Sequence, residues 1–102
     1  MSEITKLDEE IIVRPGRDVV ASVANEIKAE LLTIVQDSPC MLTIDLDGVE
    51  MVDSIGIGVI IATHNSLQKS GKSLRIINTS KEIFDLFSAM RLDKHFPVSC
   101  KD

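Results

Sequence analysis

The apolar residues of this chain repeat at two different spacings, and the alternation between them limits the folds open to it. The β-branched run Ile11–Val13 is followed by Pro15-Gly16, which predicts a short strand and a turn. Over Val19–Gln36 the apolar positions instead fall on one face of a helix. We expect Asp18 to cap this helix and Ser38-Pro39 to stop it.

The spacing then returns to every second residue in Met41–Leu46, which predicts a second strand. A second helix is expected to begin at Asp53-Ser54 and to end at Gly71. Ser73–Ile77 has the composition of a further strand.

The last third of the chain predicts one more helix. Thr79 and Glu82 have the spacing of a capping box. The apolar face of the helix behind them is formed by Ile83, Phe84, Phe87 and Met90. A short segment, Leu92–Val98, closes the chain, and Ile4–Leu7 is a candidate extra strand. The order of elements predicts an α/β fold. We expect a mixed sheet of about 4–5 strands, with 3–5 helices mainly on one face.

Composition limits both the size of the protein and its classes of partner. The 102 residues suffice for one domain, residues 1–102, with a mainly aliphatic core, since the chain has no Trp, no Tyr and three Phe. A net charge of -5 argues against nucleic acid as a partner. The longest apolar run, Ile55–Ala62, is far shorter than the roughly 20 residues of a membrane span, so we expect no direct membrane insertion. The N-terminus does not resemble a signal peptide, which predicts a cytoplasmic protein with Cys40 and Cys100 as free thiols.

Residues that could support catalysis are scattered. His64 lies on an apolar helix face and is expected to be packed, whereas His95 sits in a polar segment and is expected to be solvated. Asp45 and Asp47 lie close to Asp53, but turn chemistry around the neighbouring glycine accounts for them. We therefore expect no enzyme activity, no metal and no cofactor.

The stretch Asp53-Ser54-Ile55-Gly56-Ile57-Gly58 runs directly from a strand into a helix. A hydroxyl at this point lies among free backbone N–H groups at the positive end of the helix dipole, which would stabilise an attached phosphate. A plainer interpretation is that Ser54 or Asp53 caps the helix and that the glycines serve packing. The residues alone leave both interpretations open.

The stretch from Leu42 to Ile60 resembles the signature of STAS domains, the fold of bacterial anti-sigma factor antagonists. The resemblance covers roughly residues 9 to 98. It implies a protein that switches partners. In that family an anti-sigma factor, itself a serine kinase, phosphorylates the serine matched by Ser54, and a metal-dependent serine phosphatase reverses the mark. Asp53 matches the neighbouring aspartate, and Gly56 and Gly58 match the two glycines.

The resemblance makes Asp18, Asp53, Ser54, Ile55 and Gly56 the expected partner-binding residues. The unphosphorylated form would bind the anti-sigma factor or a related serine kinase, and phosphorylation of Ser54 would release it. The chain also departs from the family pattern. Ile55 stands where Ser or Thr is usual.

Two further departures lie outside the signature. The turn Gly16-Arg17-Asp18 is one residue shorter than the usual Gly-Glu-Leu-Asp and has a basic residue in place of the acid. That segment normally faces the kinase, which implies a partner unlike the sigma-regulating kinases. Arg91 replaces a usual glycine before Leu92, a change expected to matter little.

Two other functions compete with the switch. A non-switching STAS subunit would serve a transporter or signalling complex, with Ser54 as a helix cap only. A carrier protein would bear a phosphopantetheine arm on Ser54, but such proteins are helical bundles, and the strand-like runs at Ile11, Leu42–Leu46 and Ile76 speak against that fold.

Overall fold

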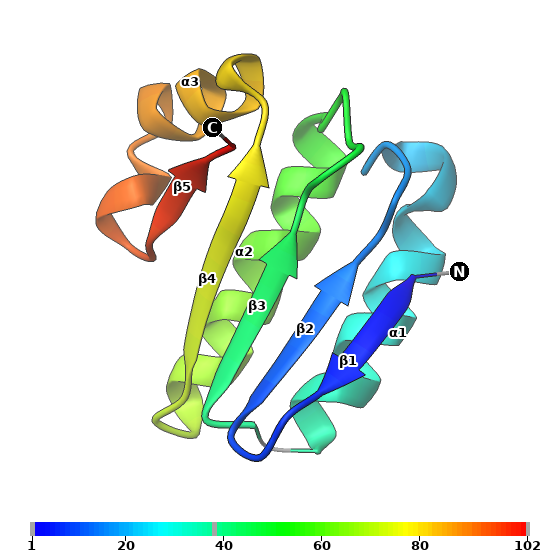
Figure 1. Ribbon diagram of the computed structural model, residues 1–102, viewed down its shortest axis with the longest axis vertical. Helices are drawn as coiled ribbons and strands as arrows, with labels where there is room; N and C mark the ends of the chain where they lie inside the picture. Colours follow the sequence, from blue (N-terminus) through cyan, green and yellow to red (C-terminus); the bar gives the residue numbers. More distant parts are fainter. Residues whose placement is uncertain (1, 38, 102) are drawn as a thin grey trace.

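The strands form one mixed sheet in the order β1-β2-β3-β4-β5 (Figure 1). This computed structural model describes residues 2–37 and 39–101. Strand β1 is antiparallel to β2, and each of the remaining neighbours pairs in parallel. The five strands are β1 (Glu3–Lys6), β2 (Glu10–Arg14), β3 (Met41–Asp45), β4 (Ser73–Thr79) and β5 (Val98–Cys100). The predicted mixed sheet is confirmed, and the candidate strand at Ile4–Leu7 corresponds to β1, Glu3–Lys6, at its antiparallel edge.

Two long helices, α1 (Ala24–Gln36) and α2 (Ser54–Lys69), lie side by side behind the sheet in Figure 1. A third helix, α3 (Lys81–Ala89), follows β4 and packs beside β5. Two short 3-10 helices, η1 (Ala21–Val23) and η2 (Leu92–Lys94), precede α1 and follow α3. The start of α2 therefore lies at the carboxyl ends of the parallel strands.

The core lies between the sheet and the two long helices. Alternate residues of the central strands point into it, including Leu42 and Ile44 of β3 and Ile76 of β4. They meet the apolar stripes of α1 and α2, such as Leu31 and Ile60. Aliphatic side chains make up most of this core, as the composition predicts.

The opposite sheet face carries a cluster of hydrogen-bonded polar side chains. Thr43 lies between two core residues of β3, so it points away from the helices, yet it is fully buried. Its hydroxyl donates to Glu10 and accepts from Arg75 Nε at 2.9 Å. Arg75 also pairs with Glu10 at 2.8 Å. Hydrogen bonds from Thr43 and then Arg75 lower the pKa of Glu10, which keeps the cluster ionised.

Two predicted helix caps are wrong. Asp18 does not cap α1, because Val19 forms a parallel bridge with Val52 and holds this segment extended. The helical turn begins only at η1. The cap of α3 is Ser80, whose hydroxyl accepts from the Ile83 N–H at 3.2 Å. Thr79 still belongs to β4.

The C-terminal end of α3 also differs from the prediction. Met90, assigned to the apolar stripe, is exposed, because α3 ends at Ala89. Arg91 has a left-handed backbone with φ of 61°. That conformation favours glycine, so the family's usual glycine has a steric reason here, and Arg91 matters more than expected.

The two glycines at the start of α2 have different surroundings. The interpretation that both glycines serve packing is wrong for Gly58, which is exposed and at which a β-carbon would meet nothing within 4 Å. Gly56 is the packing glycine. A β-carbon on Gly56 would overlap the carbonyl oxygen of Val19 and lie 2.9 Å from its carbonyl carbon. Close approach of two backbones therefore requires glycine at position 56.

We predict that Gly56→Ala destabilises the protein by about 1–3 kcal/mol or more, because backbone atoms must move to admit the methyl group. The matched variant Gly58→Ala should be neutral, or should stabilise by up to about 1 kcal/mol through helix propensity. Urea unfolding of both variants measures the difference. Equal midpoints for the two would contradict this account of the packing.

Candidate functional site

Ser54 is the first residue of α2 and is exposed. The start of α2 lies at the end of the sheet where the parallel strands finish (Figure 1). The residue before it, Asp53, is the helix cap. Its Oδ1 accepts a hydrogen bond from the Gly56 N–H at 2.8 Å, and its Oδ2 accepts from the Ala21 N–H at 2.9 Å. One carboxylate thus ties the first turn of α2 to η1.

These two N–H donors also set the charge of Asp53. The Gly56 N–H first, and the Ala21 N–H second, hold the pKa of Asp53 below its usual value. The carboxylate is therefore ionised at neutral pH. Its contribution to stability is complete above the ordinary aspartate pKa and is lost as the pH falls through the lowered value. Ser54 accordingly has a fixed negative neighbour.

The loop before Ser54 is held by the segment that follows β2. The Val19 N–H donates to the Met51 carbonyl at 3.0 Å, and the Asp53 N–H donates to the Val19 carbonyl at 3.2 Å. Asp18 Oδ1 accepts from the N–H groups of Glu50 and Met51 at 3.0 and 3.1 Å. Residues 50–53 are thus fixed by backbone and carboxylate contacts on both sides.

The surface at this site is partly apolar. Ile55 is 52% exposed and Met51 is 58% exposed, and they flank Ser54 in the sequence. Large apolar side chains that remain this exposed next to polar groups are typical of protein contact surfaces. Gly56, in contrast, is buried against Val19. Gly56 therefore packs beneath the exposed residues of the site and is not part of its surface.

Comparisons with known proteins agree on one family. The STAS domain model matches residues 2–101. This chain belongs to the STAS domain family. It is 30% identical over 91 residues to the anti-sigma-B factor antagonist of Bacillus subtilis, covering 82% of this chain and 84% of that protein.

Solved structures show the same STAS fold. An anti-sigma factor antagonist from Mycobacterium paratuberculosis has a TM-score of 0.87 at 24% identity, covering 97% of this chain and 84% of that one. The Bacillus cell fate determinant SpoIIAA in its phosphorylated form has a TM-score of 0.75 at 16% identity, covering 96% and 90%. At these identities the likeness concerns the fold alone.

Four of the five residues predicted for the site, Asp18, Asp53, Ser54 and Ile55, gather at one end of this STAS domain. Asp18 and Asp53 hold the loop through hydrogen bonds to the backbone, while Ser54 and Ile55 are exposed. The sequence analysis does not identify Met51 as a surface residue of the site, nor Val19 as the residue whose backbone supports the loop. Nothing in the local sequence around either residue predicts the pairing of Val19 with Val52.

The turn that departs from the family pattern also has a structural role. Arg17 pairs with Glu26 in the first turn of α1 at 3.2 Å. Its basic charge is therefore held against α1 by a partner within the chain.

The other acidic residues form local contacts. Asp45 accepts from the Asp47 N–H and from Asn78, which is the expected turn chemistry. Asp47 pairs with Arg14 at 2.6 Å and with Lys101. Within residues 2–37 and 39–101, no three histidine, cysteine, aspartate or glutamate side chains gather closely enough to hold a metal ion.

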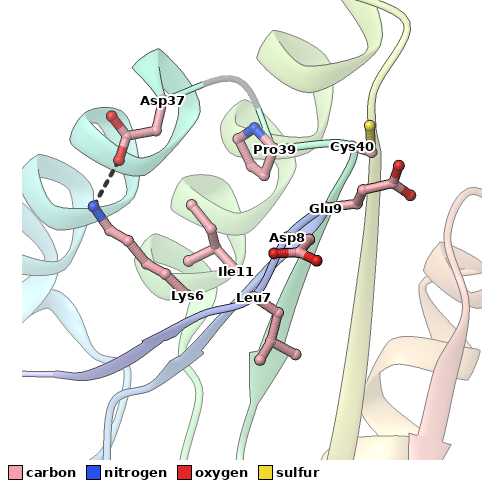
Figure 2. A pocket seen from close by; sticks show the side chains of 8 residues that line it. All are labelled: Lys6, Leu7, Asp8, Glu9, Ile11, Asp37, Pro39 and Cys40. Atoms are coloured by element: carbon pink, nitrogen blue, oxygen red, sulfur yellow. Dashed lines mark hydrogen bonds and ion pairs between the residues drawn. The ribbon is translucent and has the colours of Figure 1, made fainter.

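A hollow of about 400 Å³ lies at the other end of the sheet, beside the turn between β1 and β2 (Figure 2). Lys6 Nζ and Asp37 Oδ2 form an ion pair across it at 3.0 Å. The remaining lining residues are Leu7, Asp8, Glu9, Ile11, Pro39 and Cys40. This hollow is at the amino ends of the parallel strands and so lies apart from Ser54.

Further findings concern the whole described chain. None of the helices among the described residues has the length and apolar character needed to cross a membrane. Cys40 and Cys100 are both free and exposed, as expected.

We predict that Asp18→Ala loosens the loop before Ser54, because the N–H groups of Glu50 and Met51 lose a shared charged acceptor. A destabilisation of about 1–3 kcal/mol is expected. Asp18→Asn keeps a side-chain oxygen and should cost less. Urea unfolding gives the stability difference, and amide hydrogen exchange at residues 50–53 reports the loop itself. Unchanged exchange in Asp18→Ala would show that the loop does not depend on this carboxylate.

Proposed function

We propose that this STAS domain is a partner-switching protein controlled by phosphorylation of Ser54. Unphosphorylated, it binds an anti-sigma factor or a related serine kinase, and the phosphorylated form is released. The observation that carries the proposal is the placement of Ser54. Its side chain is exposed at the first position of α2, on a loop that Asp18 and Asp53 hold in place.

The capping arrangement favours phosphorylation over a plain cap as the role of Ser54. Asp53 makes the cap bond, to the Gly56 N–H. Ser54 is then available for another use. This weighs against the non-switching subunit, in which Ser54 would serve only as a cap. The mixed sheet weighs against the carrier protein, which requires a helical bundle.

A phosphate on Ser54 would act on the partner more than on the fold. It would add about -1.5 to -2 charges at the positive end of the α2 dipole, where negative charge is tolerated. The ionised Asp53 would add repulsion and raise the local charge density. A partner surface that covers the apolar side chains of Met51 and Ile55 would have to desolvate this charge. Binding would weaken while the domain stays folded.

Relatives support the same function. The matched Bacillus subtilis protein is an anti-sigma-B factor antagonist, and SpoIIAA exists in a phosphorylated form. Ile55, in place of the usual Ser or Thr, adds apolar area beside the phosphoacceptor. We infer that the partner presents an apolar socket here and differs from the sigma-regulating kinases in this respect.

In this scheme the domain is a substrate and a binding protein rather than an enzyme. The partner kinase supplies ATP and the chemistry of transfer, and a metal-dependent serine phosphatase removes the phosphate. Both partners would meet the protein in the cytoplasm.

We predict that a kinase partner recovered by pull-down phosphorylates Ser54 when ATP is added. Ser54→Ala should still bind but accept no phosphate. Ser54→Glu should bind about 5- to 150-fold more weakly, which corresponds to about 1–3 kcal/mol. Mass spectrometry locates the phosphate, and calorimetry measures the affinities.

A matched control for this experiment is Ser70, the exposed cap at the other end of α2. Ser70→Glu should keep the affinity of the wild type. Phosphate on Ser66, Ser70 or Thr79 with none on Ser54 would refute the proposed site, as would equal partner affinity for the wild type and Ser54→Glu.

We also predict no nucleotide affinity for the protein alone. The sequence has no phosphate-binding loop. Of the two glycines at the start of α2, Gly56 packs against Val19 and Gly58 is exposed. Isothermal titration with ATP and with GTP checks this. Saturable binding below about 1 mM, the upper end of usual enzyme KM values, would contradict it.

A further inference from the structure

The two histidines, distant in the sequence, line one hollow between α2 and η2. Its volume is about 300 Å³. His64 belongs to α2, and His95 is the residue that directly follows η2. The other lining residues are uncharged: Ile61, Asn65, Gln68, Leu92 and Phe96. The chain returns to this place through α3, which the spacing of the histidines in the sequence does not reveal.

His64 is packed as a core residue although its ring is polar. It is 7% exposed, and its ring meets Phe96 edge-on with centroids 5.1 Å apart. Phe96 in turn packs edge-on against Phe87 of α3. His64 Nδ1 is buried and has no hydrogen-bond partner among the described residues. A second proton on this ring would therefore find no acceptor at Nδ1.

The charges around His64 offer no compensation for a positive ring. Burial first, and His95 second, lower the pKa of His64. The charged residues of η2, Asp93 and Lys94, are exposed and do not line the hollow. The nearest packed elements add nothing of opposite sign. Lys81, Glu82 and Asp85 of α3 are exposed, and Lys28 of α1 lines a separate groove.

We propose that His64, beside His95, acts as a proton-sensitive latch that docks η2 and the residues directly after it onto α2 at neutral pH and releases them on acidification. When the His64 ring is neutral, it packs against Phe96 and holds the segment after η2 in place. When the ring is protonated, its charge lies in the hollow beside His95, buried and with no acceptor for Nδ1 among the described residues. The segment that carries His95 and Phe96 is the part free to move, since α2 is held by contacts with both α1 and β4.

The direction in which docking depends on pH follows from the pKa of His64. Once the segment is released, His64 in α2 has an ordinary imidazole pKa of about 6.5, and while the segment is docked its pKa is lower. Docking is complete above the ordinary value. It weakens as the pH falls below that value, until the docked ring also takes up its proton.

Release would reach beyond the hollow. Strand β5 follows Phe96 directly and pairs with β4, and the Lys101 N–H donates to the Thr79 carbonyl at 2.8 Å. Lys101 also pairs with Asp47, at the base of the loop before Ser54. Undocking would thus uncover an edge of the sheet and remove a cation from Asp47. The latch stands independently of any partner or of phosphorylation.

Amide hydrogen exchange tests the latch on the full chain at pH 7.5 and pH 5.5, with rates corrected for the intrinsic effect of pH. Residues 92–101 should lose protection about tenfold at pH 5.5, because a free imidazole is about 90% protonated there. The amides of α1 serve as the internal reference and should keep their protection. In His64→Leu, residues 92–101 should stay protected at both pH values, and in His95→Asn the loss should be smaller than in the wild type.

Three results would overturn the latch. One is unchanged protection of residues 92–101 in the wild type. Another is a loss of equal size in α1. The third is a loss in His64→Leu as large as in the wild type. If His64→Leu does not fold, an NMR titration of the wild-type His64 ring decides the matter, since a measured pKa at or above the ordinary value refutes the latch and a lowered value supports it.

Discussion

The close approach of α2 to the backbone of Val19 is the contact on which the rest of the site depends. The first turn of the helix can lie directly on this segment because residue 56 has no side chain. The pairing of Val19 with Val52 then fixes the loop that enters the helix. Through this one contact, a segment that follows the second strand becomes the support for a loop that follows the third.

The loop before α2 is held in place by its buried contacts, while its outer side chains are exposed. The carboxylates of Asp18 and Asp53, which the sequence predicts as partner contacts, accept hydrogen bonds from backbone N–H groups of the same molecule. What the surface offers is a hydroxyl next to exposed apolar side chains. Apart from the exposed Glu50, the acidic side chains of this site are thus bound to backbone N–H groups. In the proposed switch, a phosphate would add charge to the exposed side chains and leave these structural contacts in place.

Much of the fold could be predicted because its signals are local. Alternation of apolar residues marks β3, and an Asp-Ser pair marks the start of α2. The sequence-based predictions are wrong or incomplete where segments that are distant in the sequence meet. Asp18 has the composition of a helix cap, but the pairing of Val19 across the chain keeps it extended. Which glycine faces Val19 depends on the rotation of α2 about its axis, and a sequence does not fix that angle. The meeting of His64 with His95 depends in the same way on the path of α3.

The two hydrogen bonds that Asp53 accepts would affect the speed of the proposed switch. Because the carboxylate holds both η1 and the first turn of α2, the loop has little slack in which to rearrange. In the proposed switch, a modification here would change charge without changing shape. No slow refolding step would then stand between the chemical event and its effect. The response time would be set by how fast the partner dissociates and how fast the phosphate is added or removed. The partner's surface would have to distinguish the two forms by charge, because their shape is the same.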